Sequence, residues 1–321
     1  MLCKSKKIWY NTSMKNTRKE KLSFLGEPTS AKASGLTFTL AAAGLVLLSF
    51  VFLLALAIGG LWVEGVEQKE WYLYCSFLLS PLAFSLVAVW VLRWTKTPIL
   101  QEVKLQKCAP KYFLIAFLLQ VGLLSLSQLN DLFLQFLARF GYENTPIVLP
   151  SMDGFGVVGV LFAVALLPAL FEELIFRGLL LKGMRSFGTA GAVLISGALF
   201  ALYHQNPAQT LYQFCCGAAF ALVAVRSGSI LPTVFSHFLN NAVIILFTKF
   251  GVGEFSPIVS AIVLSVSIAC LVGTLVWLVW FEKKGFKKED NKTARKQFWL
   301  AAAVGIGICA LTWLSVLFSG M

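Results

Sequence analysis

Long uninterrupted runs of apolar residues constrain this chain more than any other feature of its sequence. An α-helix needs about 20 mostly apolar residues, at about 1.5 Å per residue, to cross the hydrocarbon core of a bilayer. By that criterion we predict nine membrane spans, over residues 36–63, 71–92, 112–134, 155–181, 189–204, 208–225, 230–248, 257–281 and 298–318. The fifth and sixth spans are short and flank Pro207, a residue that ends or kinks helices. The sequence therefore predicts an all-α fold, a polytopic bundle of transmembrane helices.

The composition excludes most other classes of protein. Hydrophobic residues make up 58% of the chain and charged residues only 13%, whereas about a quarter of the residues in a soluble domain are charged. The net charge is +12, but the basic residues lie in short runs between apolar blocks, which is typical of loops that face anionic lipid. We expect the lipid bilayer to be a partner of this chain and nucleic acid not to be one.

The distribution of basic residues predicts the orientation in the membrane. If the N-terminus is cytoplasmic, 23 of the 27 Lys and Arg residues fall on the cytoplasmic side and three on the opposite side, with Arg177 inside a span. This is the asymmetry of the positive-inside rule. We therefore divide the chain into a basic cytoplasmic tail (1–35), N-terminal spans (36–154), a membrane core (155–248) and C-terminal spans (249–321) with a basic cytoplasmic loop at 282–296.

Polar and ionisable side chains inside the spans are few, and each charged group costs about 2.5–3.5 kcal/mol at the centre of a spanning helix. The candidate site residues among them lie in the fourth, fifth and seventh spans and include both histidines of the chain: Glu172, Glu173, Arg177, His204, His237, Asn240 and Asn241. A pair such as Glu173 and Arg177 is by itself more typical of helix packing than of catalysis. The whole set in neighbouring spans favours a functional site.

Helical spacing suggests how these groups are arranged. Glu173 and Arg177 are four residues apart, so they share a helix face and can form a salt bridge. Glu172 lies about 100° around the same helix and is left without that partner, as suits a general base. His237 and Asn241 are also four residues apart and present two hydrogen-bonding groups together. Asn240 is expected to lie off that face.

Three motifs in this part of the chain resemble a known family. Glu-Glu-x-x-x-Arg (172–177), Phe-x-x-x-His (200–204) and His-x-x-x-Asn (237–241) occur in this order in successive membrane blocks. They are similar to the signature motifs of the CPBP family, which comprises the CAAX prenyl endopeptidases of the Rce1 type and the bacterial Abi or bacteriocin-processing proteins. The resemblance covers less than half of the chain, over roughly residues 155–248.

The resemblance implies an intramembrane protease and assigns a role to each residue. Glu172 and His204 would activate a water molecule, and His237 and Asn241 would donate hydrogen bonds to the oxyanion of the tetrahedral intermediate. The supporting residues Glu173 and Arg177 would hold the helix in register or orient the substrate. The resemblance leaves metal dependence open: zinc, if present, would be bound by Glu172, His204 and His237. We favour a mechanism that requires no cofactor, because His237 and Asn241 pair naturally as donors and the chain lacks the compact His-Glu-x-x-His zinc motif.

Two other functions are compatible with the same residues. Buried Glu and His side chains could form the proton relay of a membrane transporter, although the sequence shows no inverted repeat of the kind found in many transporters. The chain could also be a non-catalytic, immunity-type membrane protein that keeps the motifs for helix packing. For a protease, we expect a peptide or protein substrate that is itself membrane-associated: a leader peptide, a peptide pheromone or a CAAX-like segment. We expect the chain in a membrane, as a multi-pass protein, and specifically in a bacterial plasma membrane.

Overall fold

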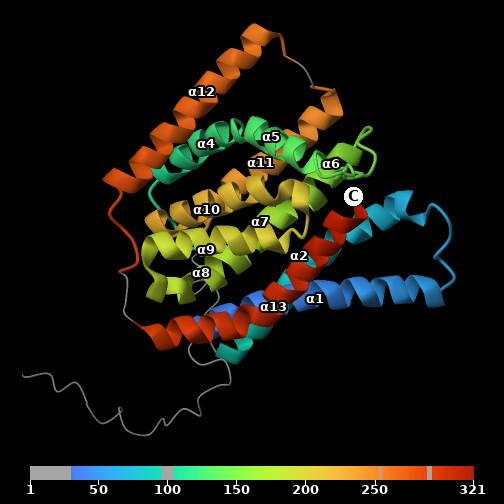
Figure 1. Cartoon of the computed structure of the whole chain (residues 1–321), viewed down its shortest axis with the longest axis horizontal. Helices are drawn as coiled ribbons and strands as arrows, with labels where there is room; N and C mark the ends of the chain where they lie inside the picture. Colours follow the sequence, from blue (N-terminus) through green and yellow to red (C-terminus); the bar gives the residue numbers. More distant parts are fainter. Residues whose placement is uncertain (1–29, 96–104, 253–254, 288–290) are drawn as a thin grey trace, which may run out of the picture.

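The computed structural model describes residues 30–95, 105–252, 255–287 and 291–321. Within them the regular structure is entirely helical, and Figure 1 shows a bundle of long helices. The main α-helices are α1 (Ala31–Ile58), α2 (Glu70–Thr95), α4 (Lys111–Leu123), α5 (Leu126–Ala138), α6 (Gly156–Val160), α7 (Leu167–Glu173), α8 (Leu181–Gly183), α9 (Gly188–Tyr203), α10 (Thr210–Ser227), α11 (Leu231–Phe250), α12 (Pro257–Val276) and α13 (Lys292–Ser319).

Short turns of other helix types join or extend these helices. The described part of the chain contains three π-helical segments, at Leu161–Leu166, Leu174–Leu180 and Trp277–Phe281. Three 3₁₀ turns occur, at Val66–Gln68, Met184–Phe187 and Pro207–Gln209. The first two π-helical segments and α6, α7 and α8 follow one another without a break, so the fourth predicted span is one composite helix, Gly156–Gly183.

Eight helical stretches of the described residues are long and apolar enough to cross a membrane. One of them, Gly156–Tyr203, is 48 residues long and folds back on itself. The rings of Phe176 and Phe200 have centroids 5.0 Å apart, whereas 24 residues of straight helix would separate them by about 36 Å. The chain reverses at the 3₁₀ turn before α9, where Gly188 has a φ of +70°. The predicted polytopic helical bundle is therefore confirmed, and with Gly156–Tyr203 counted as two segments the described residues contain one helical segment for each of the nine predicted spans.

Two predicted spans begin too late, because polar caps start the helices earlier. The first span was expected at residue 36, but α1 begins at Ala31, where the Ser30 side chain accepts a hydrogen bond from the Ala33 amide at 3.1 Å. The last was expected at residue 298, but α13 begins at Lys292, after Asn291 caps it in the same way. Most of the predicted basic tail and residues 288–290 of the predicted basic loop lie outside the described residues, and the orientation of the N-terminus stays a prediction.

The helices around the candidate site pack closely because small residues lie between them. α9 and α10 run side by side (Figure 1) and meet at Gly197 and Gly217. A Cβ atom on Gly217 would lie 3.0 Å from the Cα of Gly197 and 3.0 Å from the Cβ of Phe200. Small residues of this kind let two membrane helices approach closely. This contact brings the Gly217 backbone and the Phe200 ring next to Arg177 in the π-helical segment Leu174–Leu180.

Candidate active site

A fully buried ion pair lies at the centre of the site. Nη1 of Arg177 donates to Oε1 of Glu173 at 2.7 Å, and both side chains have no exposed surface. The salt bridge expected from their spacing is therefore present. Nη2 of Arg177 also donates to the carbonyl of Gly217 at 3.1 Å, and its guanidinium carbon lies 4.3 Å from the ring centroid of Phe200. Backbone, carboxylate and aromatic ring replace part of the water that this guanidinium would otherwise bind, and its Nε has no hydrogen-bond partner among the described residues.

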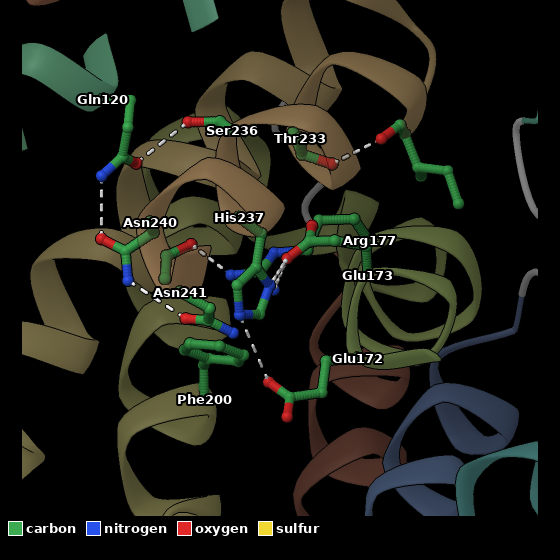
Figure 2. A network of polar contacts seen from close by, with 12 residues as sticks. Gln120, Glu172, Glu173, Arg177, Phe200, Thr233, Ser236, His237, Asn240 and Asn241 are labelled. Atoms are coloured by element: carbon green, nitrogen blue, oxygen red, sulfur yellow. Dashed lines mark hydrogen bonds and ion pairs between the residues drawn. The ribbon is translucent and has the colours of Figure 1, made fainter. Parts of the chain in front are cut away.

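His237 on α11 contacts the same carboxylate, a contact that the sequence analysis did not predict. Its Nδ1 lies 3.0 Å from Oε1 of Glu173, as Figure 2 shows. Because an ionised carboxylate can only accept a hydrogen bond, Nδ1 carries a proton and donates. The imidazole is thereby fixed in orientation, and its second nitrogen, Nε2, is turned toward Glu172.

Glu172 faces His237 across a gap that is longer than a hydrogen bond. Oε2 of Glu172 lies 3.9 Å from Nε2 of His237, and among the described residues this oxygen has no hydrogen-bond partner although it is buried. Glu172 is 8% exposed and His237 is 5% exposed. As the spacing predicted, Glu172 does not pair with Arg177. It therefore presents a buried carboxylate oxygen that is available to accept a proton.

His204 lies at the end of α9 and is partly buried. Its Nδ1 is 2.8 Å from the Phe200 carbonyl oxygen, so Nδ1 donates and Nε2 remains available. The Phe200 ring contacts both imidazoles, with centroids 4.7 Å from His204 and 5.9 Å from His237. Glu172 and His237 are among the groups that interact electrostatically with His204. The structure thus brings both histidines and Glu172 to the same region, with Phe200 against both rings.

Asn241 lies one turn beyond His237 on α11 and is held at both ends of its amide. Its Nδ2 donates to the Val164 carbonyl at 3.4 Å, and its Oδ1 accepts from Nδ2 of Asn240 at 3.3 Å. Asn240 was expected to lie off the face that carries His237 and Asn241, but this hydrogen bond connects it to Asn241. Gln120 of α4 donates to Asn240 at 2.9 Å. Nothing in the helical spacing of the motifs could indicate this contact, because Gln120 lies 120 residues away in the sequence.

The side chains proposed as zinc ligands do not form a complete set. Among the residues that the structure describes, no group of three His, Cys, Asp or Glu side chains is placed to hold a metal ion. Of these three side chains, Glu172 and His237 face each other, with Oε2 and Nε2 3.9 Å apart. The conditional zinc set of Glu172, His204 and His237 therefore does not fit this arrangement.

Comparison with known proteins supports the sequence motifs. Residues 154–243 match the model of one family, described as type II CAAX prenyl endopeptidase Rce1-like. No match was found among curated proteins or among solved structures. The matched segment contains every candidate site residue of the three motifs, from Glu172 to Asn241, and confirms the resemblance to the CPBP family in this part of the chain. Residues 154–243 of this helical chain are therefore similar to the type II CAAX prenyl endopeptidase Rce1-like family.

Proposed function

We propose that this chain is an intramembrane endopeptidase that hydrolyses a peptide bond with Glu172 as the general base. The Rce1-like domain supports a CAAX-type protease in general, and the apolar helices support a membrane location. The observation that carries the mechanism is the pair formed by Glu172 and His237, a buried carboxylate oxygen without a partner that faces an imidazole at 3.9 Å. A base and a hydrogen-bond donor on opposite sides of a small gap are what hydrolysis of an amide requires.

In the proposed reaction, Glu172 takes a proton from a water molecule whose oxygen attacks the carbonyl carbon of the scissile bond. The Nε2 atom of His204 accepts a hydrogen bond from the same water and orients it. As the tetrahedral intermediate collapses, the carbon–nitrogen bond breaks and Glu172 returns the proton to the leaving amine. A positioned base of this kind accelerates such steps by about 10²–10⁴.

The negative oxygen of the intermediate accepts hydrogen bonds from His237 and Asn241. For His237 this role needs a proton on Nε2 in addition to the one on Nδ1, so the donor is the imidazolium. Glu173 stabilises that cation through its 3.0 Å contact with Nδ1, and Arg177 balances the charge of Glu173. Removal of one oxyanion donor typically lowers kcat by about 10²–10³.

The experiment that tests this proposal uses the full-length protein in lipid nanodiscs and two fluorogenic probes. One is a peptide with a farnesylated cysteine followed by two aliphatic residues and a terminal residue, and the other is an unmodified hydrophobic leader peptide. Glu172→Gln keeps the shape of the side chain but removes the base, so we expect a loss of at least about 100-fold in kcat for the cleaved probe. The matched control is Glu67→Gln, on an exposed 3₁₀ turn, which should cleave like the wild type.

Full cleavage by Glu172→Gln and by His204→Ala would contradict the proposal. The same assay with and without EDTA tests the expectation that no cofactor is required. Cleavage that EDTA abolishes and added zinc restores would show that the metal-free mechanism is wrong.

A further inference from the structure

A buried network of amides and hydroxyls connects three helices next to Asn241, and the proposed mechanism does not use it. Oδ1 of Asn240 accepts two hydrogen bonds, one from Nε2 of Gln120 on α4 at 2.9 Å and one from the hydroxyl of Tyr212 on α10 at 2.6 Å. Gln120 is 4% exposed and Asn240 is 5% exposed. Figure 2 shows Gln120 and Asn240 aligned toward Asn241. Polar groups this deeply buried are costly unless each is satisfied, so the network has few alternative arrangements.

The two donors decide which end of the Asn240 amide faces Asn241. Because Oδ1 of Asn240 is occupied by Gln120 and Tyr212, its Nδ2 group points the other way and donates to Oδ1 of Asn241 at 3.3 Å. The carbonyl end of Asn241 is therefore fixed toward Asn240. Its amino end is then turned toward the composite helix Gly156–Gly183, where it donates to Val164.

The acceptor on that helix is the carbonyl of Val164, in the π-helical segment Leu161–Leu166. Residue 168, four positions after Val164, is proline and has no N–H to donate to this carbonyl. Asn241 Nδ2 donates to this carbonyl at 3.4 Å. A side-chain amide carries two N–H bonds. With one directed at Val164 and Oδ1 held by Asn240, a single N–H of Asn241 is left for the substrate.

We propose that Asn240 is a positioning residue that, held by Gln120 and Tyr212, fixes the Asn241 amide so that its one remaining N–H points at the oxyanion. This inference rests on the proposed function of Asn241. It extends the site beyond the Rce1-like domain, because Gln120 lies outside residues 154–243. Without the network, the Asn241 amide can turn over and present its oxygen to the oxyanion, which repels it.

The most selective test is Asn240→Asp in the nanodisc assay with whichever probe the wild type cleaves. The carboxylate still accepts from Gln120 and Tyr212, but it replaces the N–H that holds Asn241 with an oxygen. We expect kcat to fall by at least about tenfold while KM stays close to the wild type, since a small misplacement of a catalytic group can cost up to about 100-fold. Asn144→Asp, at an exposed position, adds the same charge and is the matched control.

A double-mutant cycle then shows whether the network acts through Asn241. Tyr212→Phe removes one hydroxyl and keeps the proposal testable if Asn240→Asp fails to fold. It should lower kcat in the wild-type background and have no further effect in the Asn241→Ala background. An equal fractional loss in both backgrounds, or wild-type kcat for both Tyr212→Phe and Asn240→Asp, would overturn the positioning role.

The two proposals fail in different ways. If Glu172→Gln cleaves like the wild type, the proposed mechanism is wrong, and the positioning role is wrong with it. If Glu172→Gln is inactive while Asn240→Asp and Tyr212→Phe cleave like the wild type, only the positioning role is wrong.

Discussion

The buried pair of Glu173 and Arg177 allows a stability prediction with a built-in comparison. Arg177→Met removes the 2.7 Å ion pair and the donor to the Gly217 carbonyl, and it leaves the carboxylate of Glu173 in a site with no exposed surface. Breaking a buried pair in this way destabilises a protein by about 3–5 kcal/mol, mainly because one charge is left uncompensated. We expect a loss of that size for the single variant.

The double variant Glu173→Gln/Arg177→Met separates the charge effect from the loss of contacts. It removes both charges, and the glutamine oxygen can still accept from Nδ1 of His237. We therefore expect it to be more stable than Arg177→Met alone, with a coupling energy between the two sites of at least about 2 kcal/mol. Reversible unfolding in mixed micelles with increasing SDS, followed by tryptophan fluorescence and circular dichroism, measures the four free energies of the cycle.

The ion pair of Lys111 and Glu282 is the matched comparison. Its N–O distance is 2.6 Å, close to that of the central pair, but the Lys111 side chain is 50% exposed. Exposed pairs contribute about 0–1 kcal/mol, so the cycle of Lys111→Met and Glu282→Gln should give a coupling energy in that range. Equal coupling energies at the two sites, or less than about 1 kcal/mol at the central pair, would refute the argument that burial and not distance sets the strength.

Two further predictions concern a loop carboxylate and a helix crossing. Burial raises the pKa of Glu282, but hydrogen bonds from Lys111, Tyr112 and Trp277 outweigh it and hold the pKa below the ordinary value. The ionised Glu282 carboxylate should therefore stabilise the folded protein fully above about pH 4.3, the pKa of an unfolded glutamate. This stabilisation should be lost as the pH falls through the lower pKa that Glu282 has in the folded protein. The difference in unfolding temperature between wild type and Glu282→Gln should thus shrink in strongly acidic buffer, and a difference that grows there would contradict this. At the crossing of α9 and α10, Gly217→Val should destabilise the protein by about 1–3 kcal/mol and reduce cleavage. Gly273→Val, where a Cβ meets nothing within 4 Å, should do neither, and equal effects in a thermal unfolding assay would show that the tight crossing is unimportant.

Periodic features of the sequence predicted the local parts of this structure well. Apolar runs of sufficient length indicated the helical segments, and the four-residue spacing of Glu173 and Arg177 indicated their salt bridge. Both depend on neighbours within one helix. The ends of α1 and α13 were missed because the capping residues Ser30 and Asn291 lie outside the apolar runs that were used to find the spans.

Contacts between distant helices could not be predicted in the same way. The bond from His237 to Glu173 joins residues 64 positions apart, and it changes the chemistry, because it determines which nitrogen of His237 faces Glu172. The proposed zinc set likewise depended on three helices meeting at one point, and the structure brings only two of its members face to face. The motifs restricted the choice of residues, but the rotation and tilt of each helix decided the contacts.

The position of Gln120 indicates that the part of the chain needed for the candidate site begins before the segment that matches the family. The matched family domain starts at residue 154, yet α4 ends some thirty residues earlier and supplies a hydrogen bond to Asn240. A fragment cut at the family boundary would keep all three motifs and still lose that bond, leaving a buried amide oxygen with one donor fewer. Transplanting this domain into another membrane scaffold therefore means carrying α4 along with it.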